Sequence, residues 1–176
     1  MPEPVNSDPP QLHYSLIKRA AEESILPPLQ QHRITALAYS PLEAGVLARL
    51  SDSERTQASP RFAKSTTSMI DAALRETVIP IAPRHHATMP PCHHATPAQV
   101  SLAWLLQRVE VGAVVVGAST PEQAVSNAAA VDIVLTSSEQ RDVGDAFAQV
   151  RVVDAGSAGT RARRLLKRKL RKLAPG

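Results

Sequence analysis

The chain has 176 residues, of which 43% are hydrophobic and 20% are charged, a composition typical of a soluble globular protein. This length suits one domain with a hydrophobic core. No run approaches the roughly 20 apolar residues of a membrane span, and the amino terminus shows no signal-peptide pattern. The single cysteine, Cys92, excludes an internal disulfide, so we expect a protein of the reducing cytoplasm.

The basic character of the chain is concentrated near its carboxyl end. The formal net charge is +4, but residues 161–172 hold eight Lys or Arg and no acid, so the remainder carries 12 basic and 16 acidic residues. We expect residues 156–159 to be a linker to a basic helix. That helix, with three leucines along one stripe, could lie on an anionic membrane or along nucleic acid, although a solvated tail is the simpler interpretation.

The first residues after the amino terminus favour an extended segment, because residues 1–10 include four prolines. Gln11–Leu16 is a candidate short strand. Apolar residues recur at helical spacing over 19–33, where Pro27 and Pro28 predict a kink or a restart.

Residues 34–39 (ITALAY) form a short apolar run, typical of a strand buried on both faces of a parallel sheet. Residues 51–66 are polar and aperiodic, which predicts a loop. A helix is expected from about Ser68 to Pro80.

Three later helices have clear starts, each with a Thr cap and a Gln or Glu three residues on. They open at Thr96-Pro-Ala-Gln99, Thr120-Pro-Glu-Gln123 and Thr136-Ser-Ser-Glu139, and the last two are expected to end near 130 and 150. Between the first two, Ala113–Val116 is the clearest strand. Strands alternating with helices indicate parallel strands joined by right-handed crossovers.

The junction after residues 113–116 has the chemistry of a phosphate site. The strand delivers Gly117-Ala-Ser-Thr120 to a capped helix start, where backbone amides are free and the helix dipole is positive. An ordinary strand-to-helix turn has the same pattern, so this feature alone leaves both interpretations open.

Four motifs occur in order along the chain: Gln11-Leu-His-Tyr-Ser-Leu-Ile-Lys-Arg19 with Glu23-Ser-Ile-Leu-Pro27, Ala38-Tyr-Ser-Pro-Leu42 with Gly45, Thr96-Pro-Ala-Gln-Val-Ser-Leu-Ala-Trp104, and Val116-Gly-Ala-Ser-Thr-Pro-Glu-Gln123 with Asn127. Together they cover about residues 5–150 and resemble the aldo-keto reductase family. The similarity is greatest to the branch that includes potassium-channel β-subunit-like reductases.

The resemblance implies an α/β fold that is a partial (β/α)8 TIM barrel. Residues 1–155 would form roughly strands six to eight with their helices, and residues 156–176 the linker and basic helical tail. A complete barrel needs roughly 250 residues. Half of one would leave open strand edges and an exposed apolar inner face, so we expect a partner, either a second copy or an amino-terminal half.

The resemblance also implies an NADP(H) site. Gln11 would hydrogen-bond the nicotinamide carboxamide, and Tyr39 would stack on the nicotinamide ring. The other positions, which would line the pyrophosphate path or hold the adenosine end, are Ser40, Pro41, Leu42, Gly117, Ser119, Gln123, Ser126 and Asn127.

The chain departs from the family pattern at this site. Ser126 stands where the family usually has Glu, and Val46-Leu-Ala-Arg-Leu50 replaces the usual Leu-Thr-Gly-Lys after Gly45. Arg49 and Arg61 are weaker candidates for phosphate contacts, since Arg does not reproduce the shape of Lys.

No catalytic residue is assigned. The family's catalytic Tyr, Lys, Asp and His lie on its first four β/α units, and the resemblance begins here near the sixth strand. Tyr14 belongs to the strand-six motif and is not expected to be the proton donor. The leading hypothesis is therefore a truncated aldo-keto reductase that keeps part of the cofactor site and is inactive alone, so that reduction of a small carbonyl substrate would need an amino-terminal half. The alternatives are a split reductase, or a non-enzymatic module that binds membrane or nucleic acid through its basic tail.

His85, His86, Cys92, His93 and His94 place five potential zinc ligands within ten residues. The segments HHATMPPC and HHATPAQV are, however, an eight-residue near-repeat. A duplicated loop is therefore expected, and no metal is assigned.

Overall fold

In the computed structural model, the residues described are 9–48, 62, 64–82, 95–150 and 152. The expectations for Arg49, Arg61, the His/Cys segment 85–94 and the carboxyl-terminal linker and basic helix lie outside these residues. Within them, no helix is long and apolar enough to cross a membrane.

The centre of the fold is a three-stranded parallel sheet in the order β1-β2-β3, formed by Gln11–His13, Ala36–Tyr39 and Val111–Val115. The register places His13 beside Tyr39 and Tyr39 beside Val115, so the three strands end at the same edge. The expected parallel arrangement is confirmed. Each strand is a few residues shorter or shifted relative to the sequence expectation.

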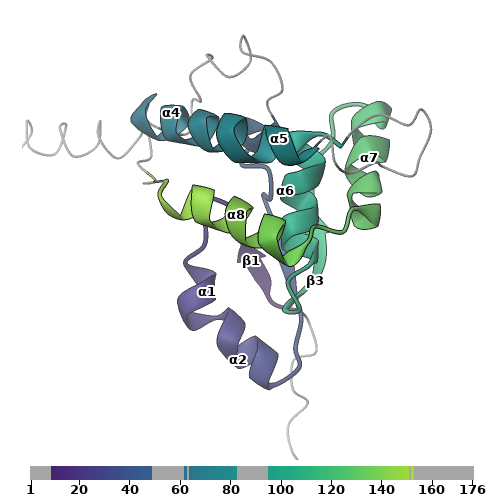
Figure 1. Cartoon of the computed structure of the whole chain (residues 1–176). Helices are drawn as coiled ribbons and strands as arrows, with labels where there is room; N and C mark the ends of the chain where they lie inside the picture. Colours follow the sequence, from purple (N-terminus) through teal and green to yellow (C-terminus); the bar gives the residue numbers. More distant parts are fainter. Residues whose placement is uncertain (1–8, 49–61, 63, 83–94, 151, 153–176) are drawn as a thin grey trace, which may run out of the picture.

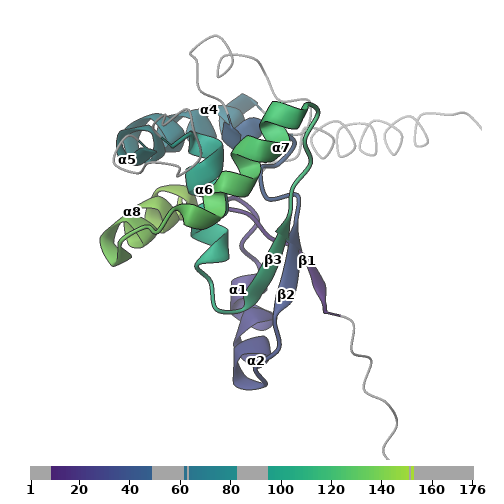
Figure 2. The same cartoon turned by 90° about the vertical axis from the view of Figure 1, so that its right-hand side faces the viewer.

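Helices connect the strands and lie on one side of the sheet (Figures 1 and 2). After β1 come α1 (Ala21–Ser24) and α2 (Leu26–Gln31), which is the predicted restart at Pro27 and Pro28. After β2 come a short 3-10 turn (Val46–Ala48), α4 (Lys64–Ala73), a π-helical turn (Leu74–Val78), α5 (Ile79–Ile81) and α6 (Pro97–Leu106). After β3 come α7 (Pro121–Ala128), a 3-10 turn (Ala129–Asp132) and α8 (Ser137–Ala148).

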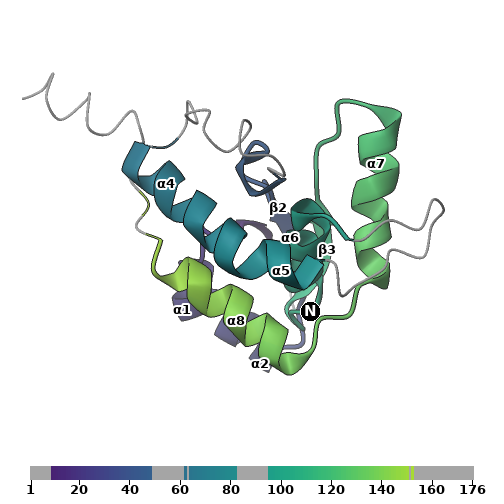
Figure 3. The same ribbon diagram turned by 45° about the horizontal axis from the view of Figure 1, so that its top comes forward.

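The start of α4 also differs from the sequence expectation. Residues 64–66 begin α4 rather than end a loop, because the buried Thr66 and Thr67 pack into the core from its first turn. Polar residue types alone had suggested a loop there. Figure 3 shows α4 and α5 running alongside α8 and over α6.

The two faces of the sheet have different surroundings. Ala36 and Ala38 of β2 are buried toward the helices, while Tyr39 is 40% exposed on the other face. On β3, Val115 is 55% exposed. No helix or strand of the described residues covers this second face (Figure 2).

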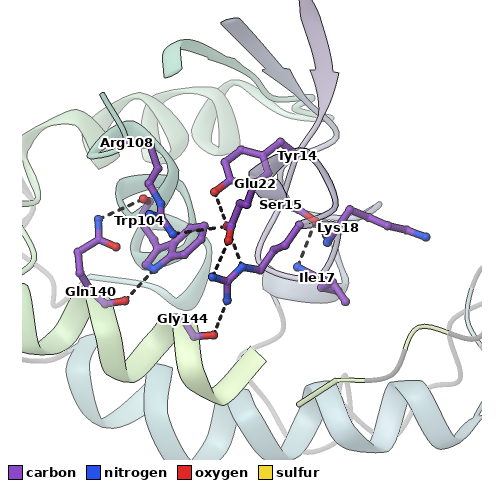
Figure 4. Close-up of polar contacts among 10 residues, drawn as sticks. Tyr14, Ser15, Ile17, Lys18, Glu22, Trp104, Arg108, Gln140 and Gly144 are labelled. Carbon is purple, nitrogen blue, oxygen red and sulfur yellow. Dashed lines mark hydrogen bonds and ion pairs between the residues drawn. The ribbon is translucent and has the colours of Figure 1, made fainter. Parts of the chain in front are cut away.

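A polar network centred on Glu22 joins the helices behind the sheet (Figure 4). Glu22 accepts hydrogen bonds from the Tyr14 hydroxyl at 2.7 Å and from Arg19 at 2.8 and 2.9 Å, and Arg108 approaches it at 3.4 Å. The two guanidinium groups also lie over the ring of the fully buried Trp104, 5.1 and 4.4 Å from its centre. We call Tyr14, Arg19, Glu22, Trp104 and Arg108 the Glu22 network.

The network anchors the last helix as well. Arg19 donates to the Gly144 carbonyl at 2.6 Å, and the Trp104 indole donates to the Gln140 carbonyl at 2.9 Å. Because both carbonyls belong to α8, the network ties β1, α1, α6 and α8 into one unit.

Candidate functional site

A cavity of about 920 Å³ opens at the carboxyl-terminal edge of the sheet, where Tyr39 ends β2 and Val115 ends β3. Its volume falls within the usual range for ligand sites, about 300–1,000 Å³. Functional sites of parallel α/β folds lie at this edge. We call it the Tyr39 cavity.

The Tyr39 cavity brings together nine of the ten residues predicted from the sequence, although they come from two separate segments. Its walls are the turn after β2, the β3–α7 junction with α7 itself, and the start of α6. The predicted residues among its lining are Tyr39, Ser40, Pro41, Leu42, Gly117, Ser119, Gln123, Ser126 and Asn127.

Gln11 is the predicted residue that does not line this cavity. It lies at the start of β1, beside Leu37, and is exposed. It shares the helix-free face of the sheet with His13, two residues further along the strand.

The turn after β2 has an unusual backbone. Ser40, Glu43 and Ala44 have φ angles of 54°, 49° and 57°, in the left-handed region that residues with a Cβ rarely adopt. Gly45 follows with φ of 85°. Strained backbone of this kind is found at ligand sites, where the surrounding structure holds it in place.

This turn places the side chain of Glu43 in the protein interior. Its side chain is fully buried, and its Oε1 lies 2.7 Å from His13 Nε2 and accepts a hydrogen bond from the Ser15 hydroxyl at 2.8 Å. The His13 ring stacks on Tyr39 with ring centres 5.1 Å apart. Sequence reasoning missed this cluster, although a histidine two positions after Gln11 and an acid directly after the Ser-Pro-Leu motif were both visible.

The β3–α7 junction organises its own backbone donors. Thr120 caps α7 by accepting a hydrogen bond from the Gln123 amide at 3.3 Å. The Gln123 side chain does not return to Thr120, as the predicted capping box requires, but accepts from the Ser119 amide at 2.8 Å. Asn127 donates to the Gly117 carbonyl at 3.4 Å. Gln123 and Asn127, both expected at the adenosine end, thus hold the residues before α7 against the first turns of that helix.

Gly117 and α7 are open on the cavity side. A Cβ built on Gly117 would meet no atom within 4 Å, and α7 buries none of its residues. The positive end of the α7 dipole favours an anion here, although the Ser119 and Gln123 amides are already engaged within the junction. Glu122 opposes it: hydrogen bonds from its own backbone amide and from Thr120 lower the pKa of this exposed carboxyl, so it remains charged.

The lining contains no Lys or Arg within the described part of the chain. The hydrogen-bonding groups that the described lining offers are backbone groups and uncharged or acidic side chains. The same part of the chain contains no group of three or more His, Cys, Asp or Glu that could hold a metal ion.

Tyr14 lies away from the Tyr39 cavity. Its ring is fully buried, and its hydroxyl donates to Glu22. Burial and that hydrogen bond raise the pKa of the Tyr14 phenol far above its usual value. This tyrosine is a structural hydrogen-bond donor.

The chain is similar to known proteins. The family model of the aldo/keto reductase family matches residues 8–146. The chain is 29% identical to the NADH-specific methylglyoxal reductase of Escherichia coli (strain K12), over 73% of this chain and 38% of that protein. It is 31% identical to a Schizosaccharomyces pombe protein described as a voltage-gated potassium channel subunit beta, over 73% of this chain and 37% of that protein.

A solved aldo-keto reductase from Bacillus halodurans, in its holo form, has a similar fold. It superposes with a TM-score of 0.56 at 20% identity, covering 77% of this chain and 41% of that one. The chain thus spans about two fifths of the length of the proteins it matches. Because the family model covers most of the residues, from the end of the proline-rich segment to α8, the chain belongs to the aldo/keto reductase family of oxidoreductases.

Proposed function

We propose that the chain is the nicotinamide-dinucleotide-binding part of an aldo-keto reductase, and that the cofactor binds in the Tyr39 cavity. The observation that carries this proposal is the pairing of two unlike walls in one cavity. Tyr39 offers an aromatic face at one wall, and the amides of the β3–α7 junction offer donors at the other. A dinucleotide has a flat ring at one end and phosphates further along, so it matches both walls.

The parallel sheet is proposed to be strands six to eight of a (β/α)8 barrel. The alternation of buried and exposed residues on β2 supports this, because a barrel strand has one face toward its helices and one toward the barrel interior. The exposed Tyr39 and Val115 would then point into the barrel, where the remaining strands or a second copy of the chain would cover them.

The form of the cofactor is proposed from the family resemblance to be NADP(H). Ser119 and Gln123 would meet the adenosine 2′-phosphate. The relative in Escherichia coli is named as NADH-specific, so the two nicotinamide cofactors need direct comparison. Because the described lining of the cavity has no basic side chain to pair with the 2′-phosphate, we expect the affinities for NADPH and NADH to differ little.

Turnover is proposed to require residues beyond those of this chain. Among the described residues that line the Tyr39 cavity, the phenol is that of Tyr39, whose ring we propose stacks on the nicotinamide. His13 Nε2 is engaged by Glu43, and the Tyr14 hydroxyl is engaged by Glu22. A carbonyl bound there would lack a positioned proton donor.

Isothermal titration of the 176-residue chain with NADPH, NADH and ADP-ribose tests this function. We expect all three to bind with one-to-one stoichiometry, with NADPH at least as tight as NADH. Tyr39→Ala should weaken the two nicotinamide forms more than ADP-ribose. Absence of binding by all three ligands to a folded chain would refute the proposal.

An activity assay tests the second half of the proposal. Mixing the chain with NADPH and methylglyoxal should give no consumption of NADPH above the rate without protein. Steady aldehyde-dependent oxidation that disappears in Tyr39→Ala would show that the chain is a complete catalyst.

A further inference from the structure

The strands on either side of Tyr39 give it different neighbours. On the β1 side, the imidazole of His13 stacks against the ring, with centres 5.1 Å apart and planes inclined by 23°. On the β3 side, the register partner of Tyr39 is Val115, and Val115 lines the Tyr39 cavity whereas His13 does not. The imidazole therefore contacts the Tyr39 ring without itself lining the cavity that Tyr39 lines.

His13 is itself held by a group that cannot move easily. Its Nε2 lies 2.7 Å from the Glu43 carboxylate, which is fully buried. The same carboxylate oxygen accepts from the Ser15 hydroxyl, and that hydroxyl accepts from the backbone amides of Ile17 and Lys18 at 3.3 and 3.0 Å. A continuous series of hydrogen bonds thus runs from the backbone after β1 to the imidazole that contacts Tyr39.

The ring of Tyr39 needs such support. It is 40% exposed and lies on the face of the sheet that no described helix or strand covers. An unsupported aromatic side chain would sample several rotamers, and a ligand would have to order it on binding.

We propose that His13, held by Glu43, is a positioning residue that fixes the ring plane of Tyr39 against the nicotinamide of a dinucleotide bound in the Tyr39 cavity. The inference rests on the dinucleotide site proposed above. Glu43 fixes the imidazole, the imidazole fixes the phenol ring, and the ring is then ready to stack before the cofactor arrives. The adenosine end is proposed to lie at the β3–α7 junction, which is a different segment of the cavity wall from the turn that carries Glu43.

The test compares two ligands on the full-length chain by isothermal titration. NADPH contains the nicotinamide, whereas ADP-ribose lacks the nicotinamide and the 2′-phosphate but keeps the adenosine and both bridging phosphates, so the affinity of each ligand is compared between variants. We expect His13→Ala to weaken NADPH about tenfold, the value of one aromatic contact, while ADP-ribose affinity is unchanged. His13→Phe keeps a ring against Tyr39 without the bond to Glu43 and should recover part of the loss. Glu43→Gln keeps a hydrogen-bonding group for His13 and should give the smallest loss.

Each other outcome has a definite meaning. Equal weakening of both ligands by His13→Ala would show a general structural role and overturn the inference, as would no weakening of NADPH. Tighter NADPH binding by His13→Ala would show that the imidazole occupies the place of the nicotinamide, and would also overturn it. Failure of the unsubstituted chain to bind even ADP-ribose would remove the proposed dinucleotide site itself, whereas the preceding outcomes leave that site intact.

Discussion

The Glu22 network lies among the helices behind the small sheet, whereas the Tyr39 cavity lies at the carboxyl-terminal edge of that sheet, and the two are built on different principles. In the network, one carboxylate receives donors from three side chains around a tryptophan with no exposed surface. In the cavity, the side chains of α7 are largely exposed and none is buried. The first region holds the helices together, and the second leaves donors and an aromatic face available. The fold therefore separates the residues that stabilise it from those that we propose bind a ligand.

Removing the centre of the network should have the largest effect. Trp104→Ala would leave a cavity among α6, α8 and two arginines, and we expect it to lower the free energy of unfolding by about 3–5 kcal/mol. Chemical denaturation followed by far-UV circular dichroism measures this. Val109→Ala, at a site that is 70% exposed, is the matched control and should change stability little. A loss below about 1 kcal/mol for Trp104→Ala would contradict the division between the two regions.

Acid should weaken the Glu22 network. Burial alone would raise the pKa of Glu22, but hydrogen bonds from Arg19 and Tyr14 outweigh burial and lower it below the ordinary value of 4.5. The stabilisation by the carboxylate is therefore complete above about pH 4.5 and is lost as the pH falls through the lower pKa of the folded protein.

Glu22→Gln tests this directly. It should cost about 2 kcal/mol at neutral pH, because charged hydrogen bonds become neutral ones, and should flatten the pH dependence of stability below about pH 4.5. Urea midpoints at neutral and acidic pH measure both effects. If stability fell equally steeply with decreasing pH in Glu22→Gln and in the unsubstituted chain, other carboxyl groups would control acid unfolding.

Two glycines at opposite ends of β3 sharpen the comparison. A Cβ at Gly112 would lie 2.6 Å from the Thr35 hydroxyl and 2.9 Å from its Cβ, whereas one at Gly117 would meet no atom. We expect Gly112→Ala to destabilise the fold by about 1–3 kcal/mol, and Gly117→Ala to leave stability unchanged.

Ligand binding should show the reverse order for these two variants. Gly117→Val adds bulk on the open side of the cavity and should weaken NADPH and ADP-ribose together. Gly112→Ala, measured under conditions where it is folded, should bind both normally. Normal affinity in Gly117→Val would place the phosphates elsewhere.

The smallest effect is expected at the cap of α7. Thr120→Ala removes the hydrogen bond to the Gln123 amide and should cost about 0.5–1 kcal/mol. The equivalent Thr136→Ala, at the cap of α8, should cost more, because α8 buries Val143 and Phe147 in the core. Thermal unfolding of the two variants side by side gives the order, and a larger loss for Thr120→Ala would show that α7 contributes more to the fold than its burial indicates.

The sequence predicted those parts of the structure that depend on neighbouring residues. The boxes at Thr96 and Thr136 formed as expected, because cap and partner are three residues apart. The residues of the Tyr39 cavity could be predicted because two motifs each include the last residues of a strand and the turn that follows it.

Features that depend on distant residues could not be predicted in the same way. The contact between Glu43 and His13 joins positions 30 residues apart. It also needs the left-handed backbone after β2, and residues 43 and 44 are neither glycine nor asparagine, the residue types that usually indicate such a conformation. The start of α4 at Lys64 is stabilised by burial of Thr66 and Thr67, which residue type alone does not reveal.

The absence of buried side chains from α7 has a consequence for protein engineering. Because the core does not constrain its sequence, the segment from Gly117 to Ala128 is a natural unit for grafting. Replacing it with the corresponding segment of a relative that prefers another cofactor should transfer that preference without redesign of the interior, provided that the link from Gln99 to the Ser126 carbonyl is preserved.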